Sequence, residues 1–355
     1  MKKIADNHAV LNHVECNIMR GFAILAVASN NFGHLVNGVV QDNEFVYDYG
    51  QVDAFVSSLR YPSNTFWLDL LAFYSPFGVM LFIFLSGYGL TLKYEKGQGV
   101  SVSNKDFILG HYLKLFQMQL KGLTLFLLIM FLFDPDYIVY FRHLVSQLLM
   151  IENMNPIDPI IIAGPYWFFG MIVEMYVIYR FVLYQKSSSF ILSVVIISLL
   201  FMIPLDPVGA AIRYLRINFC MAMLPFCLGI LVARYTNVID SLFDNGKKCL
   251  ISIMIFFLLL TICKFTFYSW IVMPIFIIGL SIPLSKIICR FKYLSAALSW
   301  VGALSGVIFV VHPIMREILI QRTNQSGNYY GMFFAYLFMT IMLSIDLKPL
   351  FLKKK

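Results

Sequence analysis

Long apolar runs separated by short polar stretches make up most of the chain. A helix needs about 20 mostly apolar residues to cross the hydrocarbon layer of a membrane. Ten segments meet this requirement, namely residues 18–40, 66–91, 111–133, 166–185, 188–205, 217–235, 249–265, 268–285, 294–320 and 328–350. The pattern predicts an all-α polytopic integral membrane protein. No polar stretch is long enough for a separate soluble domain, so we expect residues 1–355 to form a single membrane domain.

Composition supports this class. Hydrophobic residues make up 60% of the chain and charged residues 13%, whereas soluble domains carry about 25% charged residues. The net charge of +8 could suit nucleic acid, but the placement of the basic residues fits a lipid bilayer better, and no nucleic-acid partner is expected. The six cysteines form no CxxC pair, so we interpret them as packing residues and expect no metal site.

The distribution of charge predicts the orientation. With a cytoplasmic N-terminus, the inner segments hold most lysines, among them Lys2, Lys3 and Lys353 to Lys355. The outer segments then take acids such as Asp42, and this asymmetry follows the positive-inside rule. We therefore expect both termini in the cytoplasm, which an even number of spans allows. The outer loops 41–65 and 134–165 are long enough to have a function, but they could equally be simple connectors.

Polar groups interrupt the first apolar run, "MRGFAILAVASNNFGH". Arg20 opens it, and Asn30, Asn31 and His34 close it, about 21 Å further along a helix. Asn31 and His34 are three residues apart and share a helix face. Ionisable groups inside a membrane are costly and mark functional sites. The alternatives are a snorkelling arginine and a histidine with a purely structural hydrogen bond.

Three further ionisable residues lie in predicted spans. Glu174 is the one carboxylate of "YWFFGMIVEMYVIYRF" and needs a partner or a raised pKa. His312 precedes Pro313, which frees a backbone carbonyl, so a contact at the helix kink is an alternative to a functional role. Asp69 marks the outer end of the second span, where solvation could explain it.

The inner ends of the spans are basic instead. His111 and Lys114 lie on the third span, where Lys93, Arg180 and Arg20 could join them at the cytoplasmic mouth. Positive-inside charge explains part of this set. A basic funnel for an anionic, phosphate-bearing ligand would explain its extension into the third span. A cationic inner mouth and an outer His/Asn/Glu group together suit group transfer across the bilayer.

Four motifs in order resemble the acyltransferase family 3 membrane proteins. "FGVMLFIFLSGYGL" at residues 77–90 is similar to the family signature, and "MRGFAILAVASNNFGH" resembles the opening helix. "YWFFGMIVEMYVIY" and "LSGVIFVVHPIM" resemble two later helices, and "LPFCLGILVARY" also fits the family pattern. The resemblance implies an O-acyltransferase that moves an acyl group, most often acetyl, from cytoplasmic acyl-coenzyme A to a hydroxyl of a surface glycan or its lipid-linked precursor.

The chain departs from this family at its essential pair. The family carries an arginine and a histidine with ten residues between them, and counting from Arg20 the histidine position is Asn31. His34 lies about 60° away around the helix and about 4.5 Å further out, so it could serve in its place; otherwise the base is lost. The paired arginines of the family's third helix correspond to His111 and Lys114, which keep the basic character but lack the bidentate grip of arginine.

These observations give each residue an expected role. We expect His34 to act as general base, with Asn30 or Asn31 donating to the oxyanion, and Glu174 to orient the imidazole or bind the acceptor. We assign the donor, acetyl-coenzyme A, to Arg20, Lys93, His111, Lys114 and Arg180. We assign the acceptor to Asp69, Trp167 and His312.

Two other functions share the helix count and the buried polar groups. A glycan-lipid transporter or flippase would show inverted repeats, and none is evident. A catalytically degenerate scaffold of an envelope-assembly complex stays open because of the displaced histidine. We expect a multi-pass protein of the cytoplasmic (inner) membrane, with a glycan or lipid-linked saccharide as acceptor; a homodimer or an envelope-assembly complex is an open alternative for its protein partners.

Overall fold

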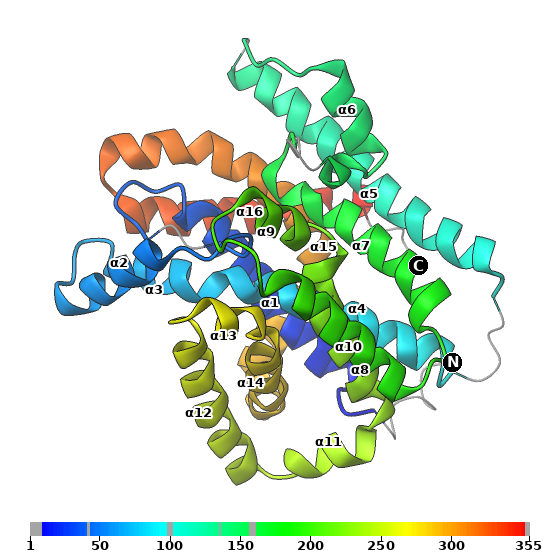
Figure 1. Ribbon diagram of the computed structural model, residues 1–355. Coiled ribbons are helices and arrows are strands. Elements are labelled where there is room, and N and C mark those ends of the chain that lie inside the picture. Colours follow the sequence, from blue (N-terminus) through cyan, green and yellow to red (C-terminus); the bar gives the residue numbers. More distant parts are fainter. Residues whose placement is uncertain (1–8, 41–42, 98–101, 135, 156–160, 352–355) are drawn as a thin grey trace.

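The computed structural model describes residues 9–40, 43–97, 102–134, 136–155 and 161–351, and every regular element in these ranges is a helix (Figure 1). Some of the charged residues on which the predicted orientation rests lie outside the described residues, namely Lys2, Lys3, Asp42 and Lys353 to Lys355. The helices are α1 (His13–Gly33), α2 (Tyr49–Arg60), α3 (Phe66–Tyr74), η2 (Ser75–Phe77), α4 (Gly78–Tyr94), α5 (Asn104–Phe133), α6 (Phe141–Leu148), η3 (Glu152–Met154), η4 (Gly164–Tyr166), α7 (Trp167–Ile178), η5 (Tyr179–Leu183), α8 (Ser188–Met202), α9 (Ala210–Arg216), α10 (Phe219–Arg234), α11 (Thr236–Leu242), α12 (Gly246–Cys263), α13 (Phe267–Ile271), α14 (Pro274–Ile288), α15 (Lys292–Ser326) and α16 (Tyr329–Phe351).

Each predicted span falls on a helix. Within the described residues, seven helical runs are long and apolar enough to cross a membrane, namely Phe66–Tyr94, Asn104–Phe133, Gly164–Leu183, Ala210–Arg234, Gly246–Cys263, Lys292–Ser326 and Tyr329–Phe351. The predicted spans 188–205 and 268–285 fall on α8 and α14, which are apolar but only 15 residues long. The chain is therefore an all-α polytopic membrane protein, as its hydropathy predicts.

The predicted first span, residues 18–40, extends seven residues past the end of its helix, and α1 is not among the seven runs named above. Helix α1 begins at His13, where Asn12 and Glu15 form a capping box, and it ends at Gly33. The residues that follow form turns, and Gly38 adopts a left-handed φ of 82°, a conformation that glycine tolerates and that ends regular structure. Asn30 and Asn31 consequently lie in the last helical turn, and His34 lies directly after it.

Four helices, α1, α4, α10 and α15, form the centre of the molecule, where α1 packs mainly on α15 and α4 packs on α10. The runs containing α4 and α10 are 76% and 78% buried over their apolar windows, against 17% for α12 and 22% for α16. The latter two helices therefore present apolar side chains outward, as expected of helices that face lipid.

Glycines allow the central helices to approach closely. A Cβ atom on Gly302 of α15 would overlap the backbone oxygen of Asn17 on α1, and one on Gly87 of α4 would overlap the backbone oxygen of Phe226 on α10. Small residues at such crossings are typical of membrane helices, because close backbone contact maximises van der Waals packing.

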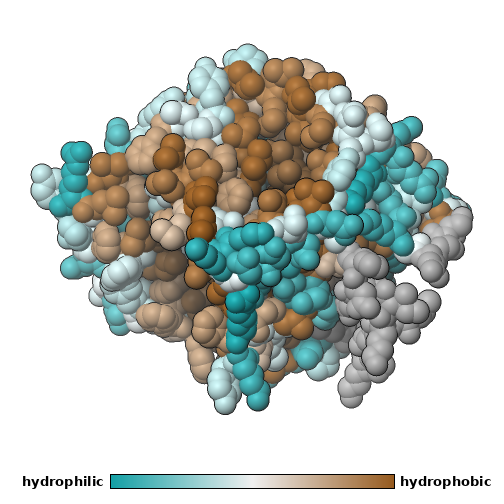
Figure 2. Space-filling view, turned by 90° about the horizontal axis from the view of Figure 1, so that it is seen from below, coloured by the Kyte–Doolittle hydropathy of each residue, from teal (hydrophilic) through white to brown (hydrophobic). Residues whose placement is uncertain are grey.

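The surface has the pattern of a membrane protein. Figure 2 shows broad hydrophobic areas on one face, with hydrophilic side chains toward its left and right margins and in a patch near its centre. Helix α12 contributes exposed apolar side chains such as Met254, which is 72% exposed, and Leu258, which is 59% exposed. In water such an area would be unfavourable, whereas a bilayer solvates it.

The predicted outer loop 134–165 is more than a simple connector. It contains α6, which lies at the edge of the molecule above α5 in Figure 1. The buried Gln147 accepts a hydrogen bond from Gln119 of α5 through its backbone oxygen, and its side chain donates to Glu152 Oε1 (3.0 Å) and accepts from the Ile162 amide (3.1 Å). One glutamine thus joins α5, η3 and the segment that leads into α7.

Candidate functional site

A cavity of about 390 Å³ opens between α1, α4, α7, α9 and α15, on the predicted outer side. Asn30, Asn31 and His34 line it from the end of α1, and Trp167 lines it from the start of α7. The structure therefore brings together four of the predicted site residues, from two motifs that lie more than a hundred residues apart in sequence.

The end of α1 determines how His34 is held. As the C-cap residue, His34 donates its backbone N–H to the Asn30 oxygen (3.1 Å), and its ring Nδ1 lies 2.8 Å from the same oxygen. A carbonyl can only accept a hydrogen bond, so Nδ1 carries the proton and Nε2 of the neutral ring is the basic nitrogen. The tautomer that a general base requires is thus set by the backbone, not by a carboxylate.

An arginine completes this wall of the cavity. Arg316 Nη1 donates to Asn31 Oδ1 (3.2 Å), and the rest of its guanidinium bonds the neighbouring Glu317. Gly164 lies against this guanidinium, and a Cβ there would make an ordinary van der Waals contact with Nη1 at 3.4 Å. Asn31 Nδ2 donates to the Val27 oxygen (2.9 Å), so the amide is fixed in orientation.

Four further polar residues line the cavity that were not predicted as site residues, namely Asn43, Glu44, Arg213 and Arg316. Asn43 and Glu44 lie in the predicted outer loop 41–65, and no motif gives a role to Arg213 or Arg316. A signal existed for Arg316, which follows His312 by four residues and so lies on the same face of a long apolar helix. Phe45 of the same loop packs against Trp167, with ring centroids 5.1 Å apart, and no periodic pattern indicates that contact.

Glu174 lies outside the lining of this cavity. Its Oε2 accepts from the Phe219 amide (2.8 Å), the first residue of α10, and its Oε1 accepts from Asn153 Nδ2 (3.3 Å). A carboxylate at a helix N-terminus satisfies free amides and complements the helix dipole. The contact that orients the His34 ring comes from Asn30 instead of Glu174.

The remaining predicted acceptor residues, Asp69 and His312, are buried. Asp69 Oδ1 accepts from the Val40 amide (3.0 Å) and so holds the turns that follow α1. His312 Nδ1 donates to the Ile308 oxygen (3.1 Å) one turn back, beside the Pro313 kink, and within the described residues its Nε2 has no hydrogen-bond partner. Neither side chain lines the cavity, although Phe309 and Arg316, on either side of His312, do.

Part of the predicted basic group converges at the opposite end of α4. Lys93 Nζ donates to Tyr94 OH (2.8 Å), which in turn lies 3.3 Å from His111 Nε2. Lys93 and Lys114 are the charged neighbours of this imidazole. Lys93 is fourteen residues along α4 from Val79 in the cavity wall, a distance of about 21 Å.

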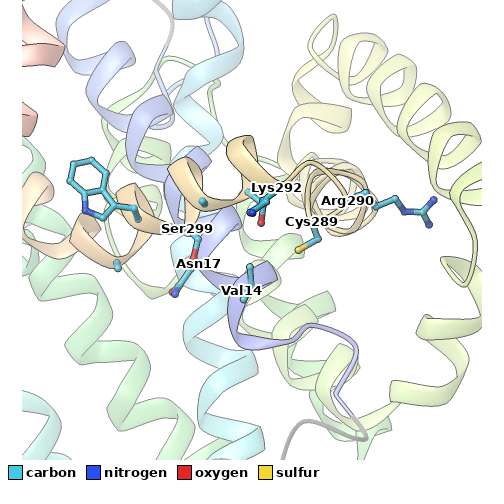
Figure 3. A pocket seen from close by; sticks show the side chains of 10 residues that line it. Val14, Asn17, Cys289, Arg290, Lys292 and Ser299 are labelled. Carbon is cyan, nitrogen blue, oxygen red and sulfur yellow. The ribbon is translucent and has the colours of Figure 1, made fainter.

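Arg180 and Arg20 have other partners. Arg180 donates to Asn104 Oδ1 and to the Val102 oxygen (both 2.6 Å), and its guanidinium lies over the Tyr184 ring, so it anchors the start of α5. Arg20 donates to Asn17 Oδ1 (2.9 Å). Asn17 lines a separate pocket of about 620 Å³ between α1, α14 and α15 (Figure 3).

That second pocket presents little positive charge. Figure 3 shows that Arg290 points away from Val14 and Asn17, and its guanidinium packs against Gly246 at the start of α12. Lys292, Ser295 and Ser299 supply the other polar groups. Among the described residues, no group of three or more His, Cys, Asp and Glu side chains could hold a metal ion.

Comparison with known proteins identifies the family of the chain. A family model described as an acyltransferase domain, of acyltransferase family 3, matches residues 14–348. No curated protein and no solved structure matches the chain. The match covers α1, whose last turn carries the cavity's amides, and nearly all of α16. The chain therefore belongs to acyltransferase family 3.

Proposed function

We propose that this membrane acyltransferase moves an acetyl group from cytoplasmic acetyl-coenzyme A to a hydroxyl of a cell-surface glycan or its lipid-linked precursor, in the cytoplasmic membrane. One observation carries the proposal. The basic Nε2 of His34 belongs to the same cavity as the Asn31–Arg316 pair, so a proton acceptor and cationic donors face one space.

The residues of the cavity suit a direct transfer. His34 Nε2 accepts the proton of the acceptor hydroxyl while that oxygen bonds to the thioester carbonyl carbon. Arg316 and the amide of Asn31 stabilise the negative charge that develops on the carbonyl oxygen. His34 then returns the proton to the sulfur as the carbon–sulfur bond breaks, which leaves an ester and a free thiol.

The inner basic group suits the donor. Lys93, His111 and Lys114 are cationic or hydrogen-bonding groups at the predicted cytoplasmic end of α4, where the phosphates of coenzyme A would bind. The distance of about 21 Å along α4 to the cavity is comparable to the reach of a pantetheine arm. A donor held at the inner end could thus present its thioester to His34.

The test is a His34→Ala variant assayed in two ways, by mass spectrometry of surface glycans in cells and by thiol release from acetyl-coenzyme A with purified protein. Loss of a general base should lower turnover about a hundredfold or more. His143→Ala is the matched control, because His143 lies on α6 beside Arg142 and away from the cavity. Unchanged acetylation in the His34 variant would refute the assignment.

A further inference from the structure

A second hollow lies on the predicted outer side, between the turn before α3 and the turn that joins α15 to α16. It has a volume of about 530 Å³ and is lined by the rings of Phe66, Trp67 and Tyr330 and by the amides of Asn64 and Asn328. Trp67 is 64% exposed. Aromatic faces combined with a few amide groups suit a ligand that has both C–H surfaces and hydroxyls, which is the chemistry of a saccharide.

The walls of this hollow are held in place by the protein. The backbone N–H of Trp67 donates to Tyr330 OH (3.3 Å), which ties α3 to the first turn of α16. Asn328 Oδ1 accepts from the Gly331 amide (3.2 Å), and Gly327 turns the chain with a φ of 66°. The hollow is thus formed by fixed elements.

An apolar groove of about 700 Å³ begins at the same tryptophan. Trp67 lines both spaces, and the groove continues along α3 and α4 to Leu81, against Leu25 of α1 and Leu280 of α14. Fourteen residues separate Trp67 from Leu81, which corresponds to about 21 Å of helix. The groove lies among predicted membrane spans and is long enough for an extended hydrocarbon chain.

We propose that the outer hollow and the apolar groove together bind one amphipathic acceptor, a saccharide attached to a lipid chain, with Trp67 at the junction of its two parts. This inference rests on the proposed acyl transfer and narrows its acceptor to the lipid-linked class. The saccharide stacks on the aromatic rings outside the bilayer, and the chain lies in the groove.

The position of the hollow relative to His34 supports this assignment. Asn324, in the last turn of α15, donates to the Leu35 oxygen (3.0 Å) and accepts from the Asn37 amide (2.9 Å). Gly327, three residues later, lines the hollow. The short segment after His34 is therefore bonded to the last turn of α15, which leads into the hollow, and on this assignment a saccharide in the hollow extends a hydroxyl toward the cavity that His34 lines.

An aromatic belt is the competing explanation for exposed tryptophan and tyrosine at a membrane surface. A belt requires only rings at the interface. It does not require amides that face the rings across a hollow, nor a groove that continues from the same ring into the membrane. The two explanations differ in whether sugar and chain are recognised together.

The experiment measures binding to the full chain in nanodiscs by native mass spectrometry with three probes: octyl glucoside, maltose, and an octyl-chain phosphocholine. We expect the alkyl glycoside to bind roughly tenfold more tightly than either of the others. Trp67→Ala should weaken that binding roughly tenfold, and Trp67→Phe should restore most of it. Tyr61→Ala is the control, since Tyr61 is 80% exposed nearby but lines neither space.

Equal binding of the three probes, or unchanged binding in the Trp67→Ala variant, would overturn the inference in favour of an aromatic belt or ordinary lipid contact. Retained binding of the Trp67→Phe variant shows that the alanine variant fails through loss of the ring and not of the fold. The His34→Ala variant separates the two proposals, because it should lose turnover while its affinity for the alkyl glycoside stays unchanged.

Discussion

At the scale of single residues, the end of α1 carries two side chains, Asn31 and His34, where the family pattern has one histidine. Asn31 stands at the position where the family spacing from Arg20 predicts histidine, and it accepts a hydrogen bond from Arg316. His34 lies beyond the last turn, with its Nδ1 bonded to Asn30. Both side chains line one cavity, so an imidazole still faces this space although it is displaced by three residues in the sequence.

The role proposed for Arg316 can be tested by Arg316→Lys, which keeps the charge. Arg316 bonds Asn31 and Glu317 through different nitrogens of its planar guanidinium, and the single nitrogen of a lysine cannot reproduce that fork. We expect kcat for acetyl transfer to fall about a hundredfold with little change in KM for acetyl-coenzyme A. Steady-state kinetics on purified protein measure this. Arg142→Lys on the exposed α6 is the control, and an unchanged kcat in the cavity variant would contradict the role.

At the scale of elements, buried polar side chains determine where helices begin and how loops are held. Glu174 caps α10, and Gln147 joins α5, η3 and the segment that enters α7. Ile161, beside the amide that Gln147 binds, lines the cavity that also holds His34. The outer loop is therefore part of the cavity wall, which its amphipathic sequence alone does not indicate.

Glu152 in this loop makes stability depend on pH. Burial is the main cause that raises the pKa of its carboxyl from 4.5 to about 8. The folded state keeps a proton that the unfolded state has lost, so the free energy of unfolding falls as pH rises from about 4.5 to about 8.

Glu152→Gln should remove much of this dependence, because the amide does not titrate. Melting temperatures between pH 5 and pH 9 in nanodiscs test the expectation. The melting temperature of the wild-type protein should fall with rising pH more steeply than that of the variant. Parallel curves of melting temperature against pH would contradict the role of Glu152.

The crossing of α1 and α15 depends on Gly302. Gly302→Ala should destabilise the protein by about 1–3 kcal/mol, because the new methyl group meets the rigid backbone of Asn17. Gly306→Ala, one turn further along α15, is the control, since its methyl group would meet the flexible end of Met118 at 3.1 Å. Chemical unfolding in detergent compares the two, and equal losses would argue against the backbone contact.

At the scale of the whole molecule, the two candidate zones lie at opposite ends of the same helices. The cavity wall includes Val79 at the start of α4, and the basic group includes Lys93 at its end. The charge asymmetry of the sequence predicts that the cavity lies outside and the basic group inside. In the proposed function, donor and acceptor would then enter from opposite sides of the membrane.

Cysteine labelling tests the orientation. Tyr61→Cys, at a position 80% exposed, should react with an impermeant thiol reagent in intact cells. Tyr293→Cys, at a position 86% exposed, should react only after the membrane is opened. Cys16 and Cys289 are partly exposed, so both variants are made in a protein in which these two cysteines are replaced by serine. The reverse labelling pattern would show that the predicted topology is the wrong way round.

The sequence by itself determined the class of the protein, the position of its helices and the motifs of its family. The class and the helix positions depend on local hydropathy, because a segment that crosses the bilayer must be mostly apolar over about 20 residues, whether its side chains face lipid or neighbouring helices. The all-α membrane fold is confirmed on that basis. The structure differs from the hydropathy pattern at the end of α1, which comes at Gly33, and in the outer loops, where α2 and α6 are short helices.

Only the tertiary structure decided which polar side chains meet. Arg316 reaches Asn31 across 285 residues of sequence, and Glu174 bonds the amide of α10 instead of the histidine ring. Inside a bilayer each buried polar group needs a partner, but many partners satisfy that need equally well. Helix packing selects among them, through glycine crossings and capped helix ends that hydropathy does not encode.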